Sequence, residues 1–263
     1  MMNKIIFLDL DDTLWHFEQI PTSALEAIQK ARKNGHKVFT NTGRSRCECP
    51  DFLWDLDFDG YCFSAGSEIY IGKKRVLYHP LDVMIVKKCT HILKSMNVGF
   101  SLEGSNMTFS NDKNRERMKQ FQTDNRMGNR FLSFPDISLM EEKDYEQIMK
   151  FSVHFEDIQQ REVLLKLLPD SLVFTTFRHL GGEATDKNYN KATAIEFVQN
   201  YFDHQYESIA MGDSENDLPM LSYANISVAM GNGCDEVKEK ATYVTDRIDN
   251  DGLYKAFQYL KLI

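Results

Sequence analysis

The sequence contains no hydrophobic run long enough to cross a membrane, no repeat and no low-complexity segment. It also lacks an excess of positive charge. Lysine and arginine number 31 against 39 acidic residues, and the net charge of −8 argues against a general nucleic-acid binder, which needs a basic face. An anionic small molecule remains a possible substrate, because one phosphate needs only a local positive pocket. The apolar start of the chain is shorter than a signal peptide, so we expect a cytoplasmic protein.

Cysteine is scarce and shows no disulfide framework, with five residues, an odd number, spread over 263 positions. The two closest, Cys47 and Cys49, have neither a second pair nor a histidine cluster to complete a metal site. Ordinary thiols, a redox pair and a pair of metal ligands all remain open, and ordinary thiols agree best with the usual behaviour of cysteine. The chain can build its core without disulfides. The oligomeric state is open, and a monomer is compatible with the sequence.

The two ends of the sequence alternate short apolar runs with helical patterns, which is typical of a parallel α/β sheet. Ser23 and Glu26 have the spacing of a capping box for the first helix, and Gly35 is suited to end it. Strands are expected at residues 4–8, 37–41, 61–64, 208–211, 226–230 and 243–245. Helices are expected at residues 190–202, 218–223, 234–241 and 253–262.

The middle of the sequence has a different pattern. Apolar side chains at 149, 151, 153 and 155 alternate with polar ones, as in a strand with one buried face in an antiparallel sheet. A further strand is expected at residues 172–178, helices at 83–96 and 157–168, and a solvated helix and loop at 111–130. We therefore predict an α/β core with a Rossmann-like parallel sheet, formed by residues 1–81 and 183–263, and an inserted α+β unit at 82–182.

An acidic motif follows the first expected strand: Asp9-Leu10-Asp11-Asp12-Thr13. If the strand continues to its end here, a period of two points Asp9 and Asp11 the same way. Neighbouring carboxylates repel each other unless a cation joins them, and the carboxyl ends of parallel strands are where such sheets bind ligands. An acidic turn with helix-capping aspartates is the alternative for this motif taken alone.

A second acidic cluster, Gly212-Asp213-Ser214-Glu215-Asn216-Asp217, follows another short apolar strand. Carboxylates from two strand ends that meet at one sheet edge need a hard dication. Mg²⁺ fits because it takes few carboxylates, keeps its waters and binds phosphate oxygens. Both clusters together favour a metal site over two capped helix starts.

Two further elements are weak alone and gain weight beside the acidic clusters. Thr42, Gly43 and Arg44 end the second expected strand, where a hydroxyl and a glycine N–H can hold a phosphate. Lys191 opens a helix, although a helix N-terminus prefers anions. A bound phosphate accounts for this lysine, and so does an ordinary surface position.

These residues in this order resemble the four motifs of the haloacid dehalogenase (HAD) phosphatases. Ser227-Val-Ala-Met-Gly-Asn-Gly and Asp251-Gly resemble the Cof-type subgroup in particular. The resemblance spans about 1–80 and 183–263 and implies a hydrolase of small phosphorylated metabolites, such as sugar phosphates, with the inserted unit as a cap. It implies that Asp9 becomes an aspartyl phosphate. It implies that Asp11 protonates the leaving oxygen and later deprotonates the attacking water.

The resemblance also implies the ligand set. Mg²⁺ would be held by Asp9, the backbone carbonyl of Asp11, Asp213 and Asp217. The phosphorylated substrate would be bound by Thr42, Gly43, Arg44, Lys191 and Asn216. Departures are few: Asp12 replaces the commoner glycine, Ala65 stands where the subgroup often has asparagine, and Ala192 follows Lys191 where glycine is usual. In the cap, Glu103, Arg178 and His179 are weak candidates for contacts with the leaving group.

Three other functions remain in view. A phosphotransferase or phosphomutase would use the same nucleophile but exclude water. A receiver-type signalling module also clusters acids, threonine and lysine, but is about half this length. An inactive phospho-ligand binder would not need all five of Asp9, Asp11, Lys191, Asp213 and Asp217. The sequence does not identify the substrate.

Overall fold

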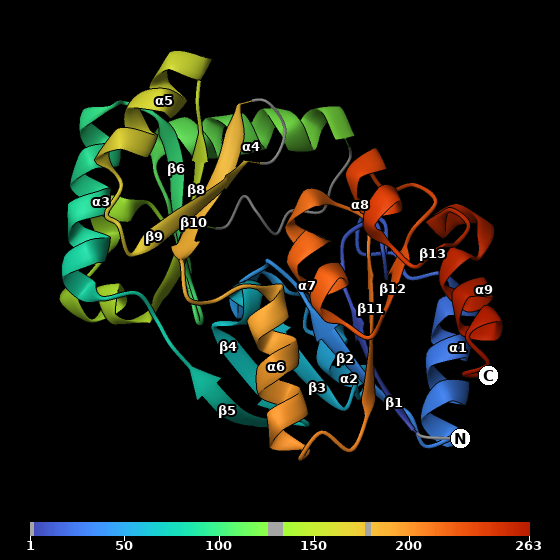
Figure 1. Ribbon diagram of the computed structural model, residues 1–263. Helices are drawn as coiled ribbons and strands as arrows, with labels where there is room; N and C mark the ends of the chain where they lie inside the picture. The colour runs from blue at the N-terminus through green and yellow to red at the C-terminus, as the bar shows by residue number, and fades with distance from the viewer. Residues whose placement is uncertain (1–2, 126–133, 177–179) are drawn as a thin grey trace. The chain divides into compact units, whose positions relative to one another are not determined.

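A computed structural model describes residues 3–125, 134–176 and 180–263 (Figure 1). The chain divides into two compact units. The first comprises Met1–Gly43, Pro50–Leu77 and Tyr189–Ile263, and the second Arg44–Cys49 and Tyr78–Asn188. The boundaries predicted at 81/82 and 182/183 thus lie a few residues from these. The short segment Arg44–Cys49 joins the second unit, a grouping that its position in the sequence does not suggest.

The first unit is built on a sheet with the strand order β13-β12-β11-β1-β2-β3-β4-β5. Parallel pairing connects all strands from β13 to β3, and β4 pairs antiparallel with β3. The strands are β1 (Lys4–Leu8), β2 (Lys37–Asn41), β3 (Gly60–Phe63), β4 (Glu68–Ile71), β5 (Lys74–Tyr78), β11 (Glu207–Gly212), β12 (Ile226–Ala229) and β13 (Tyr243–Val244). The predicted α/β class with a parallel sheet is confirmed.

Helices cover both faces of this sheet, which is why its central strands are mostly apolar. The helices α1 (Thr22–Lys33) and α9 (Gly252–Tyr259) lie on one side, and α6 (Lys191–Tyr201) and α7 (Leu218–Tyr223) on the other (Figure 1). In β1, the side chains of Ile5, Ile6, Phe7 and Leu8 have no exposed surface. The short helices α2 (Phe52–Asp55) and α8 (Asp235–Lys240) complete the unit.

The second unit is an antiparallel sheet with the order β7-β6-β8-β10-β9. Its strands are β6 (Gly99–Gly104), β7 (Thr108–Ser110), β8 (Ile148–His154), β9 (Leu172–Thr176) and β10 (Gly181–Asp186). The helices α3 (Val83–Ser95) and α5 (Ile158–Leu167) pack on one face and bury an apolar cluster that includes Val86, Leu164, Phe100 and Phe151. The remaining helix is α4 (Asp112–Asn125).

Most predicted elements are present within one or two residues, but the first helix begins differently. Pro21 is its N-cap, and no side chain caps it, because Thr22 and Ser23 lie inside the helix. The predicted capping box is therefore wrong, and Ser23 Oγ instead donates to Asp251 Oδ1 at 2.6 Å. The helix and loop predicted at 111–130 are described only to residue 125, where α4 ends.

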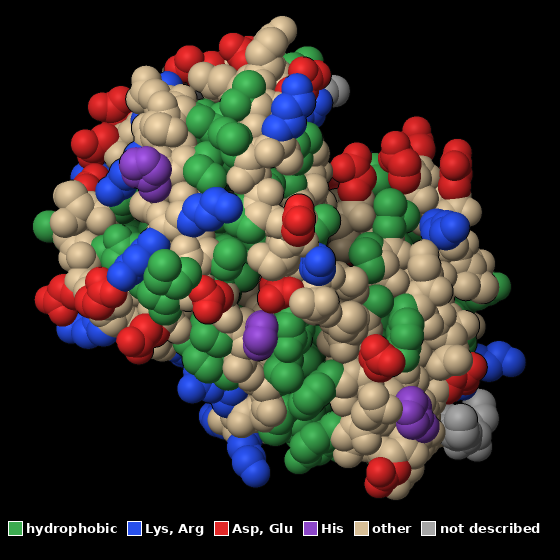
Figure 2. Space-filling model, turned by 60° about the vertical axis from the view of Figure 1, so that its left-hand side comes forward, with side chains coloured by type: hydrophobic (Ala, Val, Ile, Leu, Met, Phe, Trp, Pro, Cys, Tyr) green, Lys and Arg blue, Asp and Glu red, His purple; other side chains and the backbone are tan. Residues whose placement is uncertain are grey.

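Charges of both signs are mixed on the face of the molecule drawn in Figure 2. Figure 2 shows lysine and arginine side chains scattered among acidic ones on the face drawn, without a continuous basic stripe. Among the described residues, no helix has the length and apolar character needed to span a membrane.

Candidate active site

Two neighbouring strands carry the acidic motifs to the same edge of the sheet. β1 and β11 pair in parallel, with Leu8 opposite Met211. Asp9 leaves the end of β1, and its N–H donates to the Met211 carbonyl at 3.0 Å. Asp213 follows the end of β11 directly. The two motifs are about 200 residues apart in the sequence, and the parallel register brings their first aspartates together.

Asp217 is held against the end of β11 by the turn that follows it. Its Oδ2 accepts hydrogen bonds from the backbone N–H groups of Asp213 at 2.9 Å and Ser214 at 3.0 Å. Gly212 makes this approach possible, since a Cβ at that position would lie 2.4 Å from the Asp217 Cγ. The side chain of Asp217 has no exposed surface, so this carboxylate is both buried and fixed.

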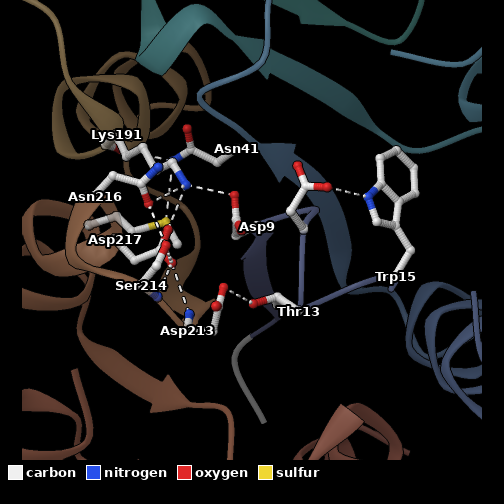
Figure 3. Close-up of polar contacts among 11 residues, drawn as sticks. Asp9, Thr13, Trp15, Asn41, Lys191, Asp213, Ser214, Asn216 and Asp217 are labelled. Atoms are coloured by element: carbon white, nitrogen blue, oxygen red, sulfur yellow. Dashed lines mark hydrogen bonds and ion pairs between the residues drawn. The ribbon is translucent and has the colours of Figure 1, made fainter. Parts of the chain in front are cut away.

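Lys191 extends into the acidic cluster from the first residue of α6 (Figure 3). Its Nζ lies 2.6 Å from Asp9 Oδ1, 2.6 Å from Asp217 Oδ1 and 3.4 Å from Asn216 Oδ1. The side chain of Asn190 caps the helix by accepting the N–H groups of Ala192 and Thr193, so Lys191 does not have to satisfy them. The lysine is 1% exposed, which rules out the surface position considered from the sequence.

The charges of this cluster do not balance. Three carboxylates (Asp9, Asp213 and Asp217) and one ammonium (Lys191) give −3 + 1 = −2 when all are ionised. Burial, reinforced by the charge of Asp217, raises the pKa of Asp213 to about 7, and burial raises the pKa of Asp9 well above its usual range. Burial lowers the pKa of Lys191, but the charges of Asp217 and Asp9 outweigh it, so its net shift is upward.

The same three carboxylates are suited to a metal ion. Asp9, Asp213 and Asp217 each offer an oxygen within 4.8 Å of the others. All-oxygen carboxylate donors fit a hard dication, and a charge of +2 would balance the excess of −2 in this cluster. The donor chemistry and the charge therefore both fit the predicted cation.

Asp11 lies beside this cluster and is held separately. β1 ends at Leu8, so the expected strand period does not relate Asp11 to Asp9. Asp11 Oδ1 accepts a hydrogen bond from Trp15 Nε1 at 3.0 Å, and Trp15 is fully buried (Figure 3). Asp12 has φ of 59°, a left-handed conformation that glycine adopts without strain. This conformation explains why glycine suits this position of the first HAD-like motif.

The other predicted binding residues lie in different surroundings. Thr42 is 1% exposed at the end of β2, and its N–H donates to the Cys62 carbonyl at 2.9 Å. Gly43 ends the first segment of the first unit. Arg44 belongs to the second unit, where its Nη1 donates to the Glu48 carbonyl at 3.3 Å. Asn216 joins the cluster through Lys191, whereas Arg178 and His179 lie outside the described residues.

Two polar residues at the site, Asn41 and Thr13, were given no role in the sequence analysis. Asn41 is fully buried, and its Nδ2 donates to the Lys191 carbonyl at 2.8 Å, which fixes the start of α6. Thr13 Oγ1 donates to Asp213 Oδ1 at 3.2 Å. A polar residue that ends an apolar strand, as Asn41 does, is the signal that would have identified it.

The five cysteines are free thiols. Cys47 Sγ donates to the Gly104 carbonyl at 3.2 Å, and burial raises its pKa to about 11. A thiol with this pKa is a poor nucleophile, so ordinary thiol behaviour is favoured over a redox pair. Cys47 and Cys49 are not part of the described carboxylate cluster that could hold a metal ion.

Comparison with known families gives a match over nearly the whole chain. The sequence profile of the haloacid dehalogenase-like hydrolases matches residues 6–257. A 5-amino-6-(5-phospho-D-ribitylamino)uracil phosphatase of Bacillus subtilis is 29% identical over 265 residues, covering 97% of this chain and 95% of its own. A mannosyl-3-phosphoglycerate phosphatase of Pyrococcus furiosus is 25% identical, covering 93% of this chain and 98% of its own.

Solved structures have the same fold. A HAD-superfamily phosphatase from Bacteroides thetaiotaomicron superposes with a TM-score of 0.84 at 26% identity, covering 100% of this chain and 96% of the other. A subclass IIB sugar phosphatase superposes with a TM-score of 0.84 at 24% identity, covering 99% of this chain and 100% of the other, which is a likeness of fold.

Proposed function

This chain belongs to the haloacid dehalogenase-like hydrolases of the Cof type, and from that premise we propose that it is a Mg²⁺-dependent phosphatase of small phosphorylated metabolites, sugar phosphates in particular. The observation that carries this proposal is the buried Lys191 between Asp9 and Asp217. Relatives named as phosphatases of a phosphoribitylamino compound and of mannosyl-3-phosphoglycerate support the same reaction and a small organic leaving group.

Asp9 is the proposed nucleophile. Its carboxylate oxygen forms a bond to phosphorus while the bond from phosphorus to the leaving oxygen breaks, which gives an aspartyl phosphate and an alcohol. Water then attacks the phosphorus, inorganic phosphate leaves and the Asp9 carboxylate is regenerated. Two displacements replace one, and the second restores the enzyme.

Asp11 is the proposed acid and base of the two steps. It would give a proton to the leaving oxygen in the first step and take one from water in the second. The hydrogen bond from Trp15 to Asp11 Oδ1 orients this carboxyl. The turn Asp9-Leu10-Asp11 keeps the nucleophile and the acid two residues apart, close enough to serve one phosphoryl group.

The remaining groups are proposed to bind the phosphoryl group and neutralise its negative charge. Lys191, Thr42 and Asn216 are the proposed partners of the phosphoryl oxygens, with Gly43 beside them. Mg²⁺ would be held by the carboxylates of Asp9, Asp213 and Asp217 and the backbone carbonyl of Asp11, where it would neutralise negative charge on the phosphoryl group. Phosphoryl transfer depends mainly on positioning and charge neutralisation, and this cluster can provide both. The second unit is the proposed cap.

The proposal is tested by phosphate release from a panel of sugar, nucleotide and small-acid phosphates, with Mg²⁺ or with EDTA. We expect Mg²⁺-dependent turnover by the wild type, and a loss of at least about 10³-fold in Asp9→Asn, as when a nucleophile is removed. The matched control is Asp55→Asn, which changes an exposed aspartate of the same unit and should keep full activity. A folded Asp9→Asn protein with a tenth of the wild-type rate would refute the nucleophile assignment.

A further inference from the structure

The segment that follows the proposed nucleophile closes into a tight turn. The Leu10 carbonyl accepts hydrogen bonds from the backbone N–H groups of Leu14 at 2.9 Å and Trp15 at 3.0 Å. The Trp15 carbonyl in turn accepts the backbone N–H of Asp12 at 2.8 Å, and Asp11 and Trp15 form an isolated β-bridge. The backbone of this turn therefore places Trp15 beside Asp11.

The indole of Trp15 is fixed by its surroundings. Its side chain has no exposed surface. Its ring packs edge-on against the ring of Phe52 on α2, with the centroids 5.8 Å apart and the planes at 68°. Both residues belong to the first unit, as does Asp11. An indole has few side-chain torsions, and close packing leaves a buried one no second orientation. The Trp15 ring is thus a rigid support within the first unit.

The polar edge of this indole is directed at the proposed acid and base. Trp15 Nε1 donates to Asp11 Oδ1 at 3.0 Å (Figure 3). Asp11 is only partly buried, so burial alone does not hold its carboxyl in one rotamer. A buried indole N–H needs an acceptor, and a backbone carbonyl would satisfy it equally well. The use of a carboxyl that the proposed mechanism requires indicates a role beyond core packing.

An indole suits a partner that changes its protonation state. The indole N–H is a donor only and carries no charge, and a carboxyl oxygen can accept it whether the carboxyl is protonated or ionised. A lysine or arginine in the same place would strongly favour the ionised carboxylate and oppose the retention of a proton. The neutral donor of Trp15 can therefore hold the Asp11 carboxyl in both steps of the proposed reaction.

We propose that Trp15 is a positioning residue, which directs the Asp11 carboxyl to the leaving oxygen while the aspartyl phosphate forms. In this step the Asp9 oxygen bonds to phosphorus, the bond from phosphorus to the leaving oxygen breaks, and the Asp11 proton passes to that oxygen. A misdirected acid slows the departure of a basic alkoxide far more than that of an anion that is stable without a proton. The inference rests on the proposed phosphatase function and gives Trp15 a part in its first step.

The test compares Trp15→Phe with the wild type on p-nitrophenyl phosphate, on phenyl phosphate and on the best substrate of the metabolite panel, whose leaving group is an alkoxide. The ratio kcat/KM reports the formation of the aspartyl phosphate, because its hydrolysis is the same for every substrate. Nitrophenolate leaves without a proton, phenolate is more basic at nearly the same shape, and an alkoxide needs the proton most.

The substitution removes the N–H donor and keeps an aromatic ring. We expect kcat/KM to fall about tenfold for the metabolite, less for phenyl phosphate, and within twofold for p-nitrophenyl phosphate, with an unchanged dependence on Mg²⁺. A tenfold loss corresponds to about 1.4 kcal/mol, the size of one hydrogen bond. In an Asp11→Ala background, Trp15→Phe should cause no further loss that is selective for the metabolite, because Trp15 acts through Asp11.

Trp54→Phe is the matched control, since it makes the same substitution at the other tryptophan of the chain, in the same unit. It should leave the ratios between the three substrates unchanged. Equal losses for all three substrates in Trp15→Phe, or no loss, would show that Trp15 only packs the core and would overturn the inference. A full selective loss in the Asp11→Ala background would overturn it as well.

Two further arrangements keep the test decisive. If Trp15→Phe does not fold, Phe52→Leu loosens the same indole from an exposed position, and a loss that does not depend on the leaving group would overturn the inference. If the wild type hydrolyses no aryl phosphate, the comparison between the wild-type and Asp11→Ala backgrounds decides, with the metabolite as substrate. If the folded wild type releases phosphate from no compound, the proposed function itself fails and the inference falls with it.

Discussion

Lys191 Nζ lies 2.6 Å from Asp9 Oδ1, although 182 residues separate them in the sequence. The first residue of α6 and the first residue after β1 meet because α6 packs on the sheet beside the end of β1. Without a bound cation, Lys191 is the positive charge that lies within hydrogen-bonding distance of both Asp9 and Asp217. The first three predictions follow from this arrangement.

Replacing Lys191 with methionine should remove activity and much of the stability. The change keeps the side-chain volume but leaves the two buried carboxylates of Asp9 and Asp217 without their ammonium, and breaking a buried ion pair typically costs about 3–5 kcal/mol. We expect a melting temperature lowered by many degrees in EDTA and partly restored by Mg²⁺, with at least about 10³-fold less activity, since a transition-state cation is lost. Lys240→Met, at an exposed position of α8, is the control for calorimetry and kinetics. Equal melting temperatures for the two variants would contradict the role of Lys191.

Asp9→Asn should stabilise the metal-free protein while it abolishes turnover. It removes one charge from a cluster with a net charge of −2, where burial already raises the pKa of Asp9. The expected gain is about 1 kcal/mol in EDTA, typical of relieving like-charge repulsion at a site that sacrifices stability for function. The variant should also bind Mg²⁺ more weakly, because Asp9 is a proposed ligand. In a thermal-shift assay, titration with MgCl₂ should therefore raise its melting temperature less than that of the wild type. A full Mg²⁺ effect in the variant would exclude Asp9 as a ligand.

Gly212→Ala should damage the site through Asp217. The added Cβ would lie 2.4 Å from Asp217 Cγ, and at such a distance one of them must move. Because Asp217 is fully buried and pairs with Lys191, we expect a loss of about 2–3 kcal/mol of stability by overpacking, together with weaker Mg²⁺ binding. Gly99→Ala makes the same change where the nearest atoms lie at an ordinary 3.5 Å. Urea unfolding and the Mg²⁺ dependence of activity should separate the two variants, and equal behaviour would contradict the steric argument.

Ala65→Asn should stabilise the protein. Ala65 has φ of 53°, a left-handed conformation that asparagine tolerates better than alanine. We expect a gain of about 0.5–1 kcal/mol, comparable to other substitutions that relieve backbone strain. Urea unfolding of Ala65→Asn and Ala65→Gly measures this gain. The free energy of unfolding of both variants should exceed that of the wild type. A loss of stability in both would show that alanine carries no strain there.

The stability of the protein should fall between about pH 4.5 and pH 8 because of Glu48. Burial, followed by the charge of Glu103, raises the pKa of Glu48 from 4.5 to about 8. In that window the unfolded chain has lost the Glu48 proton while the folded chain keeps it, so the free energy of unfolding decreases as pH rises. Below pH 4.5 both states hold the proton, and the contribution is constant. Glu48→Gln should therefore reduce the dependence of the urea midpoint on pH, and its gain in stability over the wild type should be largest at pH 8. The control Glu162→Gln, at an exposed position of α5, should leave this pH dependence unchanged.

Part of the site could be predicted from the hydrophobic pattern of the sequence. Apolar runs that stop at Asp9 and Asp213 predict strand ends, and parallel strands place their carboxyl ends at one edge. The strands at 4–8 and 37–41 were predicted with the bounds that the structure has. Other elements were missed although part of their pattern was present. Phe100 and Leu102 alternate with Ser101 and Glu103 in β6, but six residues are a short signal, and β10 begins with two glycines.

By itself the sequence determined which side chains end the strands of the core, because local hydrophobic patterning decides where a strand begins and stops. Only the tertiary structure decided which strand ends are neighbours. It placed β11 beside β1, brought Lys191 into the acidic cluster and placed Glu48 against Thr108 in the second unit. Those relationships depend on strand order and on packing between residues far apart in the chain, and a local pattern does not contain either.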